Sequence, residues 1–410
     1  MSIAASVAGV CGSDLVLDLE RFDLDEIAGR HDTPFYLYDL AVVERRVAAL
    51  RAALPGRFRL AYAVKANPHP AVLERVASLG LGADVASGCE LDRVIAAGFD
   101  AGRVVFTGPG KRDSELAAAV SAGVGPITVE SPGELRRLES IAVAAGRGIP
   151  ILLRRSLDPG VGAAAETTRI IGDAGAGKFG MDDDDLRVSA RFALDSPWLD
   201  LRGVDAFGAS NVLDPAAIVR HIEQTMAFGR DLALALGFPL RTIDVGGGLG
   251  IPYADQEPGL DLAVLAAGLE DLSRAWAADP ITAATEVLME PGRFLVGPAG
   301  AYVTRVVDTK RVRGRAIATV DGGINHLLRP VLVGQPQRIH RLAGLGTGDE
   351  PVTIAGPLCT GLDILARDLP IGMPEVGELL AVLDAGAYGY TEAMPLFLSR
   401  PLPAEVIAGR

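Results

Sequence analysis

The stretch Leu60-Ala61-Tyr62-Ala63-Val64-Lys65-Ala66-Asn67-Pro68 is an apolar, β-type segment that ends in a lysine and a proline-containing turn. It places Lys65 at a strand end among apolar neighbours that disfavour its charge, because burial lowers the pKa of a lysine. A lysine tuned in this way is a candidate nucleophile toward an aldehyde. Many strand-end lysines only extend their ammonium to solvent, so the assignment depends on the rest of the chain.

The segment that ends at Lys65 is the first of eight short apolar segments that alternate with helical stretches. Such alternation is typical of a parallel α/β fold. Eight units over about 250 residues match a TIM (β/α)8 barrel, which we predict; a doubly wound sheet is the alternative. The expected strands are Arg59–Ala63, Gly82–Val85, Val104–Phe106, Ile127–Val129, Ile151–Leu153, Val204–Phe207, Thr242–Val245 and Glu286–Met289. The expected helices include Pro70–Leu79, Glu90–Ala97, Asp113–Ala122, Gly133–Ala145, Asp214–Leu236 and Asp261–Ala277.

After Pro291 the pattern changes to strands joined by Gly- and Pro-containing turns, with little helical periodicity. We expect an N-terminal segment, 1–40, that joins a β domain, a barrel at 41–293, and the C-terminal β domain itself at 294–410. The strand-like Phe35–Tyr38 could pair into that domain. Its other expected strands are Ala301–Val307, Ala316–Val320, Pro351–Ile354 and Leu379–Leu383.

The composition is that of a soluble globular protein. Of 410 residues, 49% are hydrophobic and 22% charged, and the net charge is −13. This charge argues against nucleic acid or an anionic membrane as a partner, and no apolar run is long enough to cross a bilayer. Because the N-terminus lacks signal-peptide features, we expect a cytoplasmic protein. The cysteines, odd in number and widely spaced as in a reducing compartment, are Cys11, Cys89 and Cys359.

Polar residues follow several expected strands, at the end of the barrel where TIM-barrel active sites lie. We expect them to converge on one barrel mouth. The acidic run Asp182–Asp185 instead opens a helical segment, where carboxylates favour the helix dipole, and we expect no metal site. The converging residues are Lys65, Asp84, Arg154, Ser210, the loop Gly246-Gly247-Gly248-Leu249-Gly250, Glu290 and Arg293.

The glycine loop and the charged groups around it indicate a phosphate-bearing cofactor. Consecutive glycines let backbone N–H groups approach an anion, and a following helix would add its dipole; a plain tight turn is the alternative. With Ser210 and Arg293 nearby, a phosphate is favoured. Glu290 could keep a heteroaromatic ring nitrogen protonated, unless it forms a structural salt bridge with Arg154 or Arg293. Together with Lys65, these groups specify pyridoxal 5′-phosphate (PLP).

Six motifs occur in one order along nearly the whole chain. They are Ala63-Val64-Lys65-Ala66-Asn67, Gly177-Lys178-Phe179-Gly180, Gly246–Gly250, Glu290-Pro291-Gly292-Arg293, Gly356-Pro357-Leu358-Cys359 and Asp384-Ala385-Gly386-Ala387-Tyr388. With them, the chain from about Thr33 to Leu402 resembles the fold-type III PLP enzymes, specifically the ornithine/diaminopimelate decarboxylase superfamily. The resemblance implies a TIM barrel and a β domain formed from both chain ends, in agreement with the pattern of strands and helices.

The resemblance also implies a cofactor site shared within a homodimer. Lys65 would bind the PLP aldehyde covalently, and Asp84 would orient it. Cys359 would enter the partner subunit's site and donate a proton after carbon dioxide leaves; a small buried thiol is the alternative. Lys178 and Asp363 match positions that pair across the family's dimer interface. The residues expected to contact the cofactor are Lys65, Asp84, Arg154, Phe207, Ser210, Gly246, Gly247, Gly248, Glu290, Arg293 and Tyr388.

Two departures from the family pattern bear on the cofactor and the substrate. Phe207 stands where a histidine normally stacks on the PLP ring, so an aromatic face is kept. After Cys359, ornithine and diaminopimelate enzymes place an acid that helps bind the substrate's distal ammonium, whereas this chain has Thr360. An uncharged hydroxyl cannot pair a buried ammonium, so free ornithine, lysine or diaminopimelate would be poorly accommodated.

The segment 321–330 carries further substrate candidates. It keeps the arginine of diaminopimelate decarboxylases as Arg329, but the tyrosine expected four positions later is Val333. His326 is unusual there, and it either reaches the substrate pocket or is a plain surface histidine. The expected substrate-binding residues are His326, Arg329, Thr360 and Asp363.

These features favour a PLP-dependent amino-acid α-decarboxylase of a specialised biosynthetic pathway. Its substrate would be a small-molecule amino acid or an acidic aminoacyl group tethered to a carrier protein by a phosphopantetheine arm. The basic cluster Lys310-Arg311-Val312-Arg313-Gly314-Arg315 is a candidate docking surface for an acidic carrier, or else an edge strand guarded by charge. The alternatives are a diaminopimelate decarboxylase and a catalytically inactive regulatory homologue; Glu290 argues against an alanine racemase.

Overall fold

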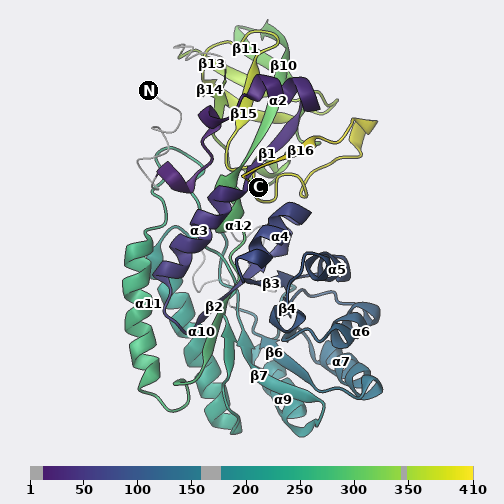
Figure 1. Ribbon diagram of the computed structural model, residues 1–410, viewed down its shortest axis with the longest axis vertical. Helices are drawn as coiled ribbons and strands as arrows, with labels where there is room; N and C mark the ends of the chain where they lie inside the picture. The colour runs from purple at the N-terminus through teal and green to yellow at the C-terminus, as the bar shows by residue number, and fades with distance from the viewer. Residues whose placement is uncertain (1–12, 158–176, 343–348, 410) are drawn as a thin grey trace. The chain divides into compact units, whose positions relative to one another are not determined.

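The chain folds into two compact units, which we call the barrel unit and the β unit (Figure 1). The computed structural model describes residues 13–157, 177–342 and 349–409, so Cys11 lies outside the described residues. The barrel unit comprises Ala48–Gly250 and Leu260–Gly292. The β unit comprises Met1–Val47, Ile251–Gly259 and Arg293–Arg410, and thus takes 251–259 from within the range expected for the barrel.

Eight parallel strands close into a barrel in sequence order, which confirms the predicted TIM barrel. The last strand pairs with the first, with Phe58 opposite Val287 and Leu60 opposite Met289. This closure excludes the doubly wound alternative, whose sheet would have two free edges. The strands are β2 (Phe58–Ala63), β3 (Gly82–Val85), β4 (Val104–Phe106), β5 (Ile127–Val129), β6 (Ile149–Arg154), β7 (Leu199–Asp205), β8 (Thr242–Asp244) and β9 (Glu286–Met289).

Helices surround these strands, with α5, α6 and α7 on one side of the view and α10 and α11 on the other (Figure 1). Short polar side chains fix where several helices begin, because an N-cap oxygen satisfies a free backbone N–H. Ser87 and Ser131 accept such bonds from Glu90 and Glu134. Asp182 caps the helix that the acidic run was predicted to open. The helices are α4 (Pro70–Ser78), α5 (Gly88–Ala96), α6 (Asp113–Ala122), α7 (Pro132–Ala145), α9 (Asp183–Asp195), α10 (Pro215–Leu236) and α11 (Leu262–Ala277), with the 3₁₀ turns η3 (Val64–Ala66) and η4 (Ala101–Arg103).

The strand register brings charged residues to one level at the C-terminal end of the barrel. Arg154 at the end of β6 lies opposite Asp205 at the end of β7. Asp205 in turn lies opposite Asp244 at the end of β8. Asp84 on β3 lies opposite Ala63, the last residue of β2. The barrel therefore presents three acids and one arginine at the mouth, near the turn η3 that contains Lys65.

The β unit is built on an eight-stranded sheet. Its path runs β12-β15-β10-β11-β13-β14, and β1 pairs with β10 and β16. Pairing of β1 with the sheet confirms the prediction for Phe35–Tyr38, whereas β12, β14 and β16 were not predicted. The strands are β1 (Phe35–Asp39), β10 (Gly300–Val312), β11 (Arg315–Val320), β12 (Ile339–Arg341), β13 (Pro351–Ala355), β14 (Ile364–Pro370), β15 (Leu379–Val382) and β16 (Ala404–Ala408).

Both faces of this sheet are buried at β1. Along β1, Tyr36 and Tyr38 belong to one hydrophobic core and Phe35 and Leu37 to another, as the two-residue repeat of a strand requires. Apolar residues of the N-terminal segment cover the second core. The remaining elements are α2 (Leu24–His31), α3 (Leu40–Ala53), which the two units share, α12 (Arg293–Val296), α13 (Arg329–Val333), and the 3₁₀ turns η1 (Ser13–Leu15), η2 (Leu19–Arg21), η5 (Gly297–Ala299) and η6 (Phe397–Ser399).

The basic cluster 310–315 forms the tip of the β10–β11 hairpin, where Val312 pairs with Arg315. Arg313 and Gly314 both have positive φ, 52° and 80°, the conformation of a two-residue hairpin turn. Arg311 forms an ion pair with Glu350 at 2.6 Å. Among the described helices, none combines the length and the apolar character needed to span a membrane.

Candidate active site

Lys65 lies two residues after the end of β2, in the 3₁₀ turn η3. Its Nζ lies 2.5 Å from Oδ2 of Asp84, and its side chain is 47% exposed. Asp84 is buried, and its other oxygen accepts a hydrogen bond from the Thr107 hydroxyl at 2.6 Å. The structure thus corrects the expected apolar setting: a buried carboxylate, itself fixed by Thr107, orients an ammonium group that small ligands can reach.

Three buried carboxylates converge beside this pair. Asp205, Asp244 and Glu290 each place an oxygen within 4.8 Å of the others. Burial and the neighbouring Asp244 raise the pKa of Glu290 well above its ordinary value, and burial and Asp205 do the same for Asp244. Burial raises the pKa of Asp205 to about 6, although Arg154 opposes the shift. So many acids in one buried space favour a cationic group bound among them.

Glu290, like Asp205 and Asp244, has one buried carboxylate oxygen without a hydrogen-bond partner among the described residues. In Glu290 this oxygen is Oε1. Arg154 pairs instead with Glu130 at 2.9 Å and Asp205 at 3.3 Å, and its guanidinium lies 4.8 Å from the centre of the Phe179 ring. The alternative of a structural salt bridge between Glu290 and Arg154 is therefore wrong. A buried carboxylate oxygen without a partner suits a protonated ring nitrogen.

The glycine loop packs against the other strand ends through its backbone. Gly246 and Gly248 have positive φ, 63° and 88°, and Asp244 accepts a hydrogen bond from the Gly246 N–H at 2.8 Å. A Cβ at Gly247 would overlap the Glu290 carbonyl, and one at Gly248 would overlap the Ala209 carbonyl. The expected helix dipole is wrong, because α11 begins only at Leu262. The loop itself, as a close-packed backbone concavity, remains suited to an anion.

We expect Gly247→Ala to weaken PLP binding by about tenfold or more, because the added Cβ forces the loop away from the Glu290 backbone. Titration of the apoprotein with PLP, followed by absorbance, measures the change. Gly29→Ala is the matched control, since Gly29 lies in α2 with no atom within 4 Å of an added Cβ. Equal PLP affinity in the two variants would contradict the role given to the loop.

Phe207 and Ser210 lie in the segment that follows β7. The Phe207 side chain contacts the position of Gly246, so the aromatic ring borders the glycine loop. His221 on α10 was not predicted, although its Nε2 lies 3.1 Å from the carbonyl oxygens of both Ala206 and Val245. Burial lowers the pKa of His221. As a neutral donor, it ties together the ends of β7 and β8.

The β unit holds another part of the predicted set. Arg293 is buried, donates to the Tyr253 hydroxyl at 2.7 Å and lies 4.9 Å from the centre of the Tyr388 ring. Arg329 lies 4.7 Å from the same ring and pairs with Glu392 at 2.7 Å. The Nε of Arg329 is buried without a hydrogen-bond acceptor among the described residues. Two cations therefore share one phenol ring, and one keeps a donor available for an anion.

His326 is 3% exposed, so the surface-histidine alternative is wrong. Its Nδ1 lies 3.2 Å from the Tyr302 hydroxyl and its Nε2 2.9 Å from the Pro401 carbonyl oxygen. Burial lowers the pKa of His326, which favours the neutral ring. Both ring nitrogens thus serve contacts within the β unit.

Asp363 and Cys359 lie on neighbouring turns of the β unit. The buried Asp363 carboxylate accepts hydrogen bonds from the N–H groups of Ile324 at 2.8 Å and Leu358 at 2.7 Å, and so joins the segments that carry His326 and Cys359. Cys359 is exposed, so the buried-thiol alternative is wrong. Lys178 lies in the barrel unit and is exposed.

The barrel unit alone brings together Lys65 on Asp84, the glycine loop and the buried Glu290, whose Oε1 has no hydrogen-bond partner among the described residues. A lysine for an aldehyde, a backbone cradle for an anion and a carboxylate for a ring nitrogen define an enzyme that binds PLP at the C-terminal mouth of a TIM barrel. The residues present fit the cofactor. The buried acids around Glu290 favour a bound cation, and the protonated pyridine ring of PLP is a cation.

Comparison with known proteins identifies the class within the PLP enzymes. A family model described as the pyridoxal-binding domain of pyridoxal-dependent decarboxylases matches residues 40–297. The chain is 31% identical over 400 residues to an L-glutamyl-[BtrI acyl-carrier protein] decarboxylase of Niallia circulans, covering 95% of this chain and 92% of the relative. It is 34% identical over 389 residues to a diaminopimelate decarboxylase of Vibrio cholerae serotype O1, covering 95% and 90%.

A solved structure agrees with these relatives. The crystal structure of diaminopimelate decarboxylase from Helicobacter pylori complexed with L-lysine matches with a TM-score of 0.85 and 30% identity, covering 94% of each chain. The chain belongs to the pyridoxal-dependent decarboxylase family. It is a PLP-dependent amino-acid carboxy-lyase, as the motifs predicted.

Proposed function

We propose that this enzyme removes the α-carboxylate of an acidic aminoacyl group carried on a carrier protein. The observation that carries the proposal is Thr360, which stands where the family's free-diamine enzymes place an acid. Its hydroxyl accepts a hydrogen bond from the Leu362 N–H at 3.3 Å, so it serves the backbone of its own turn. A tethered acidic substrate has no distal ammonium to bind, and the unpaired Nε of Arg329 is a donor suited to an anion.

Sequence identity does not separate the candidates, because the carrier-protein decarboxylase of Niallia circulans and the diaminopimelate decarboxylase of Vibrio cholerae are 31% and 34% identical to the chain. The exposed hairpin tip 310–315 supports the carrier proposal as a basic docking surface for an acidic partner. Arg311 is partly neutralised there by Glu350, which leaves Lys310, Arg313 and Arg315 as the main cations.

In this proposal each residue has a separate task. Bound PLP withdraws electrons from the substrate Cα as the carboxylate bond breaks. Lys65 supplies the amine that holds the cofactor, and Asp84 orients that amine. Glu290 keeps the ring nitrogen protonated, and the glycine loop and Ser210 of the barrel unit hold the phosphate. Phe207 supplies an aromatic surface for the ring.

We further propose that the enzyme is a homodimer in which Cys359 completes the partner subunit's site. The exposed thiol supports this, together with Leu362 nearby, which is 66% exposed. A large apolar side chain exposed next to a proposed catalytic thiol is a feature of a surface that another chain covers. Cys359 would then protonate the substrate Cα after carbon dioxide leaves.

We expect the PLP-loaded enzyme to release carbon dioxide from an L-glutamyl thioester on an acyl carrier protein at least about a hundredfold faster, in kcat/KM, than from free L-glutamate. Meso-diaminopimelate and L-ornithine are assayed in parallel. Turnover of meso-diaminopimelate above that of the thioester would reject the proposal in favour of lysine biosynthesis. Absence of turnover with every substrate, by protein that is shown to hold PLP, would favour the regulatory homologue.

A further inference from the structure

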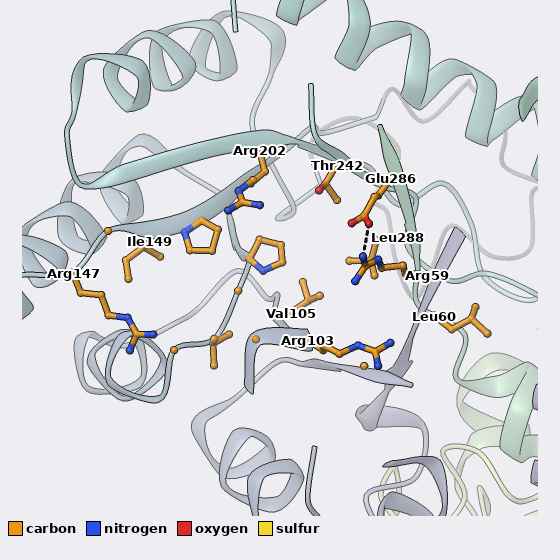
Figure 2. Close-up of a pocket in the computed structure, with 18 residues that line it drawn as sticks. Arg59, Leu60, Arg103, Val105, Arg147, Ile149, Arg202, Thr242, Glu286 and Leu288 are labelled. Carbon is orange, nitrogen blue, oxygen red and sulfur yellow. Dashed lines mark ion pairs between the residues drawn. The ribbon is translucent and has the colours of Figure 1, made fainter. Parts of the chain in front are cut away.

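A second concave site lies at the opposite end of the barrel from Lys65. A cavity of about 470 Å³ opens where the strands begin, and we call it the basal pocket (Figure 2). Along β6 the pocket is lined by Ile149, whereas Arg154 of the same strand lies at the catalytic mouth. At about 3.3 Å per residue the two ends are roughly 16 Å apart.

Four arginines surround the basal pocket, and they come from different parts of the barrel (Figure 2). Arg59 extends from β2, Arg103 from η4, Arg147 from the turn before β6, and Arg202 from β7. Glu286 is the one carboxylate among the residues that line the cavity. In a chain whose net charge is −13, such a group of cations is a local reversal of charge that attracts anions.

The structure leaves part of this positive charge without a counter-ion. Arg59 pairs with Glu286 at 2.5 Å, and Arg202 pairs with Asp200 at 2.6 Å. Arg147 donates to the Val120 carbonyl at 3.1 Å, which compensates no charge. The exposed Arg103 side chain has no partner among the described residues. The guanidinium groups of Arg103 and Arg147 are therefore available to an anion, for which their planar forks are well suited.

The floor of the basal pocket is apolar. Val105, Ile149 and Leu288 contribute aliphatic side chains from three strands, and Pro126 and Pro150 also line the cavity. Its volume lies within the range of sites for small organic ligands. An inorganic anion would use the arginine rim and leave this floor uncovered, whereas a ligand with both an apolar body and phosphates would use both.

We propose that the basal pocket binds an organic phosphate, with its phosphate groups on the arginine rim and its apolar or aromatic body on the floor. The site is separate from the catalytic mouth, because it lies at the end of the barrel where the strands begin, whereas Lys65 lies at the end where they finish. The proposal is therefore independent of which amino acid the enzyme decarboxylates.

The test uses PLP-saturated enzyme, so that phosphates cannot enter the cofactor site, and ATP as the probe. Calorimetry without divalent cations should show ATP binding that weakens as salt rises. Tripolyphosphate should bind at least about threefold more weakly, because it lacks the apolar body, and adenosine at least about tenfold more weakly, because it lacks the phosphates. An unchanged PLP spectrum during the titration shows that the catalytic site is not involved. No ATP binding, or equal affinity for ATP and adenosine, overturns the proposal.

Charge-reversal variants locate the binding. Arg103→Glu should weaken ATP by about tenfold or more. Arg136→Glu is the control, since Arg136 is an exposed arginine of α7 outside the pocket, and ATP affinity should be unchanged. If Arg103→Glu fails to hold PLP, Arg202→Gln replaces it and should weaken ATP by about threefold or more. If the pocket variant that folds and holds PLP binds ATP as tightly as the wild type, the proposed site is wrong.

Discussion

Lys65→Ala is expected to lower the decarboxylation rate by at least about a thousandfold, while the folded protein still binds PLP without a covalent bond. Borohydride reduction of the wild-type holoenzyme should fix the cofactor on Lys65, and mass spectrometry of the digested protein identifies the labelled lysine. The structure provides an internal control in Lys111, which is also a barrel lysine but is 1% exposed and paired with Glu134 at 2.7 Å. Because Lys65 is half exposed and Lys111 is enclosed, the label should appear on Lys65 alone. A label on Lys111, Lys178 or Lys310 would contradict the assignment.

The same variant tests the proposed sharing of the site. If Cys359 serves the partner subunit, a dimer of one Lys65→Ala chain and one Cys359→Ala chain contains one complete site. Random exchange between the two inactive homodimers should then restore about a quarter of the wild-type activity. Each variant incubated alone is the control. Demonstrated exchange without any recovery of activity would mean that Lys65 and Cys359 do not act across subunits.

The sequence predicted the barrel well because each strand carries its own signal. Four of the eight strands, including β3 and β9, have the predicted bounds, since a buried parallel strand is a continuous apolar run. The strands β12, β14 and β16 were missed for the opposite reason. Much of β14 and β16 is only partly buried, so their sequences lack both a long apolar run and a strict alternation.

Lys65 and the glycine loop could be predicted from the sequence, because in each a single residue type or a short motif carries the chemistry. The acid cluster could not be predicted, because its members come from three strands, and only the register places Asp205 opposite Asp244. His221 was missed since it lies on a helix, where it resembles any histidine beside apolar neighbours. Asp363 was predicted as a substrate-binding residue, but its hydrogen bonds with two backbone N–H groups could not be predicted from its position in the chain.

Glu290→Gln is expected to lower kcat by about a hundredfold or more, because a glutamine cannot form the ion pair that keeps the PLP ring nitrogen protonated. Glu270→Gln, on the exposed face of α11, is the control and should leave kcat unchanged. In the apoprotein, Glu290→Gln should raise thermal stability at pH 7, since it removes a buried acid whose ionised form is disfavoured by burial and by the neighbouring Asp244. A variant that lost activity and stability together would point to a structural role for Glu290.

The dependence of apoprotein stability on pH follows from the raised pKa values. A carboxyl whose pKa is higher in the folded than in the unfolded state holds its proton more tightly when folded, so stability is greatest at low pH and is lost as pH rises. For Asp205 this loss extends from its ordinary 3.8 to about 6, and for Glu290 it begins near the ordinary 4.5 and continues well above it. The melting temperature of the apoprotein should therefore fall from pH 5 to pH 8, and less steeply in Glu290→Gln. PLP should remove much of this slope, because its protonated ring nitrogen compensates the acid that Glu290 contributes. A melting temperature of the apoprotein that rose from pH 5 to pH 8 would contradict the inference that the acid cluster of Asp205, Asp244 and Glu290 favours a bound cation.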